Sequence, residues 1–135
     1  MPRENDIRGA PADWLSRARS DIALARAPLP EGAVYESLCF HARQAAEKAV
    51  KAVYKAKGHR FEYTHNIGHL LHGLEREGIL VPQAAWEAAD LTRFAWEARY
   101  PGVAEPVTQA EYREAVAQAA RVLEWAARVV EGTAP

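Results

Sequence analysis

The chain has 135 residues, 49% hydrophobic and 26% charged, with a formal net charge of −1 at pH 7. A domain of this size buries enough surface to fold without a disulfide, and its single cysteine can form none within the chain. The small net charge excludes a general attraction to nucleic acid or anionic membranes, so such binding requires a local patch.

Apolar residues recur every three or four positions along most of the chain, and this spacing predicts helices. The first helix is predicted over residues 11–27, before Pro28 and Pro30, and the second over residues 32–57, before Gly58. Their expected core positions are Trp14, Leu15, Ala18, Ile22 and Ala25 in the first, and Tyr35, Leu38, Ala42, Ala45, Ala49 and Val53 in the second.

Capping residues mark the later helices. Asn66 is suited to cap the third helix, which should end before Gly78, and a fourth helix is predicted over residues 82–99. Thr108 and Glu111 have the spacing of a capping box, so a last helix should begin there and run to the C-terminal region.

No alternating strand pattern competes with these helices, and short connections between consecutive helices favour antiparallel neighbours. We therefore expect an all-α fold, an up-and-down bundle of four to five helices, in a single domain over residues 11–131. Residues 1–10 and 132–135 are expected to be flexible termini. No apolar run is long enough to span a bilayer and the N-terminus is charged, so we expect a cytoplasmic protein with no membrane contact.

Three histidines, His65, His69 and His72, would lie within roughly 60° of one another on a continuous helix. Such a face suits zinc, but no HExxH pattern is present and the only cysteine, Cys39, lies elsewhere in an Ala-rich helix. We therefore favour a solvated or locally hydrogen-bonded face without a metal, with His65 as a residue that ties down the loop before the third helix. Cys39 is expected to be a buried, inert thiol.

A row of polar residues follows the second helix: His41, Gln44, Lys48, Lys51 and Lys55. Two interpretations remain open. The row is either a solvated face, supported by an i,i+4 ion pair between Glu47 and Lys51, or a basic stripe that presents several donors to phosphate groups.

Arg93, Arg99 and Tyr100 lie in the sequence RFAWEARYPG, at the predicted end of the fourth helix. A helix end beside a rigid Pro-Gly turn holds side chains in defined positions, as a binding site requires. Alternatively, the arginine bonds the last carbonyls and the tyrosine packs on the bundle. The chain contains no GxxxxGK[ST], GxGxxG or GxSxG, so no cofactor is predicted.

Five segments, in order, resemble the HEPN family (higher eukaryotes and prokaryotes nucleotide-binding domain): WLSRARSDIALA, YESLCFHARQAAEKAVKAVYKAKG, THNIGHLL, RFAWEARYPG and LEWAARVV. The most specific part is FHARQAAEKAVKA, which is similar to the family pattern F-H-A-x-Q-A-A-E-K-x-x-K-A. The resemblance covers about residues 12–130.

The resemblance implies a helical bundle that commonly forms a homodimer. Small prokaryotic members often pair with a minimal nucleotidyltransferase, and many such pairs behave as toxin–antitoxin modules. Some members are metal-independent ribonucleases that use an arginine followed after about four to six residues by a histidine, in one group with a tyrosine two residues later. Here Arg93 and Tyr100 match that group, but Ala98 occupies the histidine position. Arg60 and His65 also have an Arg-x4-His spacing, in a predicted loop.

We therefore expect a non-catalytic module that binds nucleotides, homodimerises and partners a minimal nucleotidyltransferase. The expected contacts with nucleotide or RNA phosphates are His41, Lys48, Lys51, Lys55, Arg93, Arg99 and Tyr100. One alternative is a ribonuclease toxin that uses Arg93 and Tyr100 with a histidine from elsewhere; another is a purely structural subunit.

Overall fold

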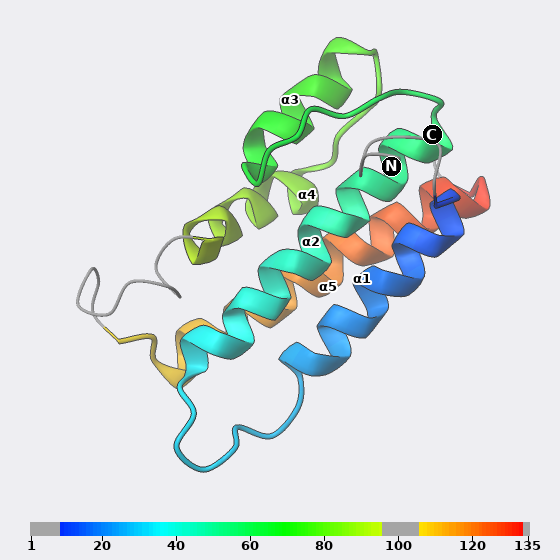
Figure 1. Cartoon of the computed structure of the whole chain (residues 1–135). Helices are drawn as coiled ribbons and strands as arrows, with labels where there is room; N and C mark the ends of the chain where they lie inside the picture. Colours follow the sequence, from blue (N-terminus) through cyan, green and yellow to red (C-terminus); the bar gives the residue numbers. More distant parts are fainter. Residues whose placement is uncertain (1–8, 96–105, 134–135) are drawn as a thin grey trace.

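The computed structural model describes residues 9–95 and 106–133, and within these ranges all regular structure is helical. The helices are α1 (Pro11–Ala25), α2 (Tyr35–Ala56), α3 (Ile67–Arg76), α4 (Gln83–Glu87), the 3-10 helix η1 (Ala88–Ala95) and α5 (Gln109–Glu131). Figure 1 shows α1, α2 and α5 side by side as three long helices, with α2 between α1 and the shorter α3 and α4. The predicted all-α bundle is confirmed.

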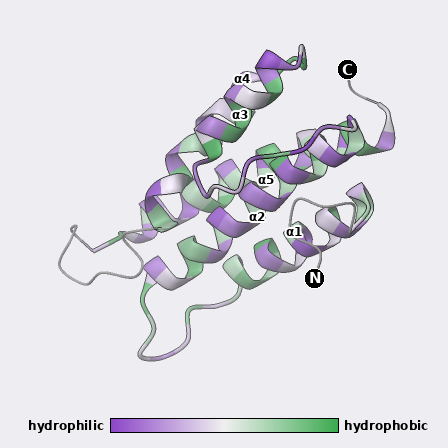
Figure 2. Cartoon of the chain, turned by 45° about the horizontal axis from the view of Figure 1, so that its top comes forward, coloured by the Kyte–Doolittle hydropathy of each residue, from purple (hydrophilic) through white to green (hydrophobic). Residues whose placement is uncertain are grey.

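The central helix is α2, which packs most extensively against α1 and α5 and also contacts η1 and α3. Its alanines permit close approach by the neighbouring helices because a methyl group fills little space between helix axes. The fully buried ones are Ala42, Ala45, Ala46, Ala49 and Ala52. Figure 2 shows hydrophobic and hydrophilic residues alternating around the long helices, as expected for amphipathic elements. Within the described ranges, no helix is both long and apolar enough to cross a membrane.

The prediction of one continuous α-helix over residues 82–99 is wrong for the residues that the structure describes, 82–95. The α-helical winding ends after five residues, and η1 continues as a 3-10 helix. The physical reason is the spacing of the buried residues Ala85, Ala88, Leu91 and Phe94, which recur every three positions and so share one face at three residues per turn. Residues 96–99 lie outside the described ranges.

The connection between α2 and α3 is folded onto α2 by an aromatic anchor. Phe61 is buried, with its ring 5.6 Å from that of Trp14 on α1 and 5.9 Å from that of Tyr54 on α2. The backbone of His59 also donates to the carbonyl of Tyr54 at 2.9 Å. These contacts hold the loop over one face of α2, which determines which polar groups of that face reach solvent.

The capping box at the start of α5 is confirmed. Backbone N–H groups are satisfied reciprocally, with Glu111 N donating to Thr108 Oγ1 at 3.1 Å and Thr108 N donating to Glu111 Oε1 at 3.0 Å. The hydrogen bond from the Thr108 backbone is the main reason why the pKa of Glu111 is lowered. The stabilisation from this carboxylate is therefore complete above its unfolded pKa and is lost as the pH falls through the folded value.

Replacing Thr108 with alanine should lower the free energy of unfolding by about 1 kcal/mol, because one N–H of the first turn loses its acceptor. Urea denaturation measures the change. The control is Thr133→Ala. Thr133 follows the end of α5, and its exposed hydroxyl donates to the backbone carbonyl of Arg128. This substitution should alter stability by less than about 0.5 kcal/mol. Equal effects of the two substitutions would show that the cap contributes no more than an ordinary surface contact.

Candidate functional site

Three charged side chains of α2 form a buried network. Arg43 Nη1 lies 2.8 Å from Glu47 Oε1, and Lys51 Nζ lies 3.4 Å from Glu47 Oε2. The exposed fractions of Arg43, Glu47 and Lys51 are 2%, 5% and 1%. Lys51 Nζ also lies 5.0 Å from the centre of the Phe61 ring. The expected Glu47–Lys51 pair is present, but it is buried rather than solvated because Phe61 covers it.

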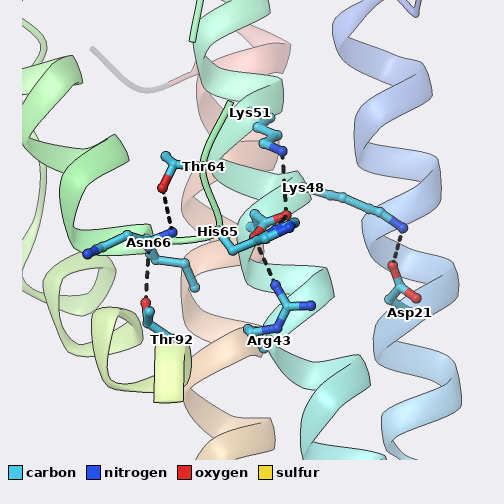
Figure 3. A network of polar contacts seen from close by, with 10 residues as sticks. Asp21, Arg43, Lys48, Lys51, Thr64, His65, Asn66 and Thr92 are labelled. Carbon is cyan, nitrogen blue, oxygen red and sulfur yellow. Dashed lines mark hydrogen bonds and ion pairs between the residues drawn. The ribbon is translucent and has the colours of Figure 1, made fainter. Parts of the chain in front are cut away.

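The loop before α3 is joined to this network through His65. His65 Nδ1 lies 3.0 Å from Glu47 Oε1, while the His65 side chain remains 57% exposed. Figure 3 shows Arg43, Lys51 and His65 converging on the same carboxylate from α2 and the loop. The expectation that His65 ties down the loop is confirmed.

A second ion pair joins α2 to α1. Lys48 Nζ lies 2.6 Å from Asp21 Oδ2, and His41 Nδ1 lies 3.5 Å from Asp21 Oδ1. Asp21 is buried, whereas Lys48 and His41 are partly exposed. His41 and Lys48, the first two basic residues of the row, therefore pair with a carboxylate on another helix, which the helical periodicity of α2 could not predict.

Lys55, the last member of the row, lies near the C-terminal end of α2, with its Nζ 5.7 Å from the centre of the Phe61 ring. Arg43 was not among the predicted site residues, yet it lies on this face, 2.8 Å from Glu47 and with its guanidinium carbon 4.8 Å from the centre of the Phe40 ring. One signal was available: positions 43, 47 and 51 are spaced i, i+4, i+8 and carry alternating charges, which places them on one helix face.

Arg93 lies on η1 and faces α5. Its guanidinium is 4.6 Å from the centre of the Phe94 ring and 3.9 Å from Glu111, and the side chain is 46% exposed. It lines an open pocket of about 300 Å³ between η1 and α5. The other lining residues are Asp90, Phe94, Glu111, Glu114, Ala115 and Gln118. The only cation among these residues thus faces three carboxylates.

The sequence profile of the HEPN domain matches residues 11–130. The chain belongs to the HEPN family. Two solved structures are similar to it over nearly their whole length. TT1696 from Thermus thermophilus is 32% identical, with a TM-score of 0.75, 88% of this chain covered and 97% of that one. ST0689, described as an archaeal HEPN homologue, is 30% identical, with a TM-score of 0.71 and coverages of 90% and 98%. No curated protein matches the chain.

The segment RFAWEARYPG of this HEPN domain lies only partly within the described residues. Arg93 is described, whereas Ala98, Arg99 and Tyr100 lie outside the described ranges. The grouping of Arg93, Arg99 and Tyr100 with the α2 row therefore stays a prediction. What the structure establishes is that Lys48 and His41 contact α1, whereas Arg93 contacts α5.

The three closely spaced histidines of the HEPN domain bind separate carboxylates. His65 contacts Glu47, His69 Nε2 lies 2.7 Å from Glu62, and His72 Nδ1 lies 3.9 Å from Glu75. The Asn66 side chain caps α3 by accepting from the backbone N–H of His69 at 3.0 Å, so His65 falls before the helix, as expected. Within the described ranges, no three His, Cys, Asp or Glu side chains are grouped to hold a metal ion.

Cys39 is fully buried on α2, and this burial raises the pKa of its thiol to about 12, with the nearby Arg93 charge opposing the shift. We expect native protein to resist alkylation at pH 8, because the thiolate is the reactive form. Mass spectrometry after iodoacetamide treatment measures the single possible adduct, and the same protein in urea is the control. Equal labelling rates in the native protein and in urea would contradict the conclusion that the Cys39 thiol is buried and inert.

Proposed function

We propose that this HEPN protein is a non-catalytic module that binds nucleotides, forms a homodimer and partners a minimal nucleotidyltransferase, as in toxin–antitoxin pairs. The observation that carries the non-catalytic assignment is the composition of the Arg93 pocket. None of the chain's five histidines is among its described lining residues, and Ala98 stands where the nuclease pattern of the family has histidine.

The chemistry supports this assignment. Metal-independent cleavage of RNA needs one group that moves a proton and one that stabilises charge on the phosphorus. Arg93 is suited to stabilise charge on the phosphorus. The carboxylates that line the same pocket, Asp90, Glu111 and Glu114, repel an approaching phosphate. The five histidines lie on α2, on α3 and in the connection between them.

A ribonuclease assay tests the non-catalytic assignment. Purified protein is incubated with RNA in the presence of EDTA, beside an Arg93→Ala variant prepared in the same way. We expect the same background cleavage from both proteins. Cleavage by the wild type that Arg93→Ala abolishes would overturn the assignment and favour the ribonuclease toxin.

The partner is tested separately by co-expression with a minimal nucleotidyltransferase from the same genome. We expect the two chains to elute together, in a stoichiometric complex, from a size-exclusion column with light-scattering detection. The HEPN protein alone should elute with the mass of a dimer. Elution of both proteins as separate species would reject the pairing without affecting the nuclease result.

A further inference from the structure

The last helix, α5, carries two neighbouring apolar rows. One row is buried in the core and consists of Ala115, Ala119, Val122, Ala126 and Val129. The other lies one residue further along at each position and consists of Val116, Ala120, Leu123, Ala127 and Val130. Both rows have the alternating spacing of four and three residues that keeps side chains on one side of a helix. In the second row only Leu123 is buried, at 9% exposure, so the bundle leaves this row partly open.

The middle of the second row forms one side of a groove between α5 and α1. Ala120, Leu123 and Ala127 line this groove together with the buried Ile22 of α1, and its volume is about 190 Å³. The α1 wall lies on the side of α2 away from α3 and α4 (Figure 1). Because the alanine side chains are short, a helix from outside can approach the groove closely.

The two walls of the groove carry opposite charges. Arg19 and Arg26 line it on α1, and Glu124 lines it on α5. All three residues are exposed, and their side chains make no ion pair or hydrogen bond with the rest of the described chain. Arg113 and Glu131 share the side of α5 on which Glu124 lies, but they are roughly 16 Å and roughly 10 Å from it along the helix axis. The groove is therefore positive along α1 and negative along α5.

We infer that this groove is the surface through which two copies of the chain form a homodimer. The inference rests on the homodimer of the proposed function and gives it a location. A closed dimer has a twofold axis, so the same surface of each copy meets the other. An axis along the groove places α1 of one copy against α5 of the other. Arg19 then faces Glu124 of the partner subunit, because both residues line the groove at the same level.

The charges favour this arrangement over others. A twofold axis across the groove would place α1 against α1, which brings the arginines of both copies together, and like charges across an interface are repelled. A foreign helix with acidic side chains would match α1 but would be repelled by Glu124 on the opposite wall. A foreign helix with basic side chains would be repelled by Arg19 and Arg26. A second copy presents both charges, each against the wall of opposite sign.

Charge reversal in the full-length protein tests this interface. Sedimentation velocity over a range of concentrations gives the dissociation constant of the dimer, and circular dichroism confirms that each variant is folded. We expect Arg19→Glu and Glu124→Arg each to weaken the dimer at least tenfold, because every like-charge contact occurs twice. The variant with both substitutions should return to within threefold of the wild type. Arg17→Glu is the matched control, since Arg17 is exposed on α1 but does not line the groove, and it should stay within twofold.

Each other outcome has a defined meaning. A wild-type dimer that both reversals leave intact would overturn this inference alone, because the homodimer would then form elsewhere. Weakening by both single substitutions without recovery in the double variant would also overturn it, since the two residues would not face each other. Reversals that spare the dimer but abolish co-elution with the nucleotidyltransferase would assign the groove to that protein instead. A wild type that sediments as a monomer at every concentration would overturn the homodimer of the proposed function as well.

Discussion

Replacing Glu47 with alanine should lower the free energy of unfolding by about 3–5 kcal/mol, the usual cost of removing one partner from a buried charge pair. Glu47 contacts two cations, Arg43 at 2.8 Å and Lys51 at 3.4 Å, and both remain buried when the carboxylate is gone. The variant also loses the anchor of His65, so the loop over α2 should become easier to digest. Urea denaturation and limited proteolysis measure the two effects.

Two further variants make this expectation specific. Glu114→Ala removes an exposed glutamate that lies 3.1 Å from Arg121, and it should cost less than about 1 kcal/mol. A triple variant with apolar residues at positions 43, 47 and 51 should be more stable than Glu47→Ala, because no charge is then left buried without its carboxylate. If Glu47→Ala costs no more than Glu114→Ala, the network is not electrostatically coupled.

Replacing Gly73 with alanine should destabilise the protein by about 3 kcal/mol, even though alanine is the better helix former. Gly73 lies within α3, where an added Cβ would collide with the hydroxyl oxygen of Tyr54. That hydroxyl is buried and donates to the Leu70 carbonyl at 2.5 Å, so Tyr54 cannot move without losing a hydrogen bond. Thermal and urea unfolding both report the change.

The steric cause can be isolated with a double-mutant cycle. Tyr54→Phe removes the clashing oxygen and should alone cost about 1 kcal/mol, through the lost hydrogen bond. The next side-chain atom of Tyr54 is 3.4 Å from the added Cβ, so the double variant should be more stable than Gly73→Ala. Gly68→Ala is the control on the same helix. Its Cβ would meet nothing closer than 3.4 Å, so it should be neutral or stabilising by up to about 1 kcal/mol.

Local signals in the sequence predicted the helical elements well. The caps at Asn66 and Thr108 were recognisable because a capping side chain bonds a backbone group only three residues away. The prediction of a continuous fourth helix failed at η1, where the buried residues recur every three positions and so favour three residues per turn. The Thr92 hydroxyl accepts from the backbone N–H of Ile67, 25 residues earlier, and no local rule anticipates that contact.

The candidate site was predicted only in part, and Lys51 shows why. Helical periodicity correctly placed Lys48, Lys51 and Lys55 on neighbouring positions of α2, but periodicity does not say what covers a face. Phe61, brought over α2 by the loop, buries Lys51, and Asp21 on α1 engages Lys48 from 27 residues away. Lys51 is therefore buried and Lys48 is paired with Asp21, whereas His65 contacts Glu47 and keeps 57% of its side chain exposed.

The sequence by itself determined the helical class, the caps, the main apolar stripes and the HEPN resemblance, because these depend on spacing and on contacts within one or two helical turns. Only the tertiary structure decided that Glu47 joins α2 to the loop and that Gly73 makes room for Tyr54. Those outcomes depend on residues at least 16 positions apart in the chain, Tyr54 with Leu70 and Glu47 with His65, which meet only when the helices pack. The free energy of such contacts comes from excluding water between elements, which no single segment specifies.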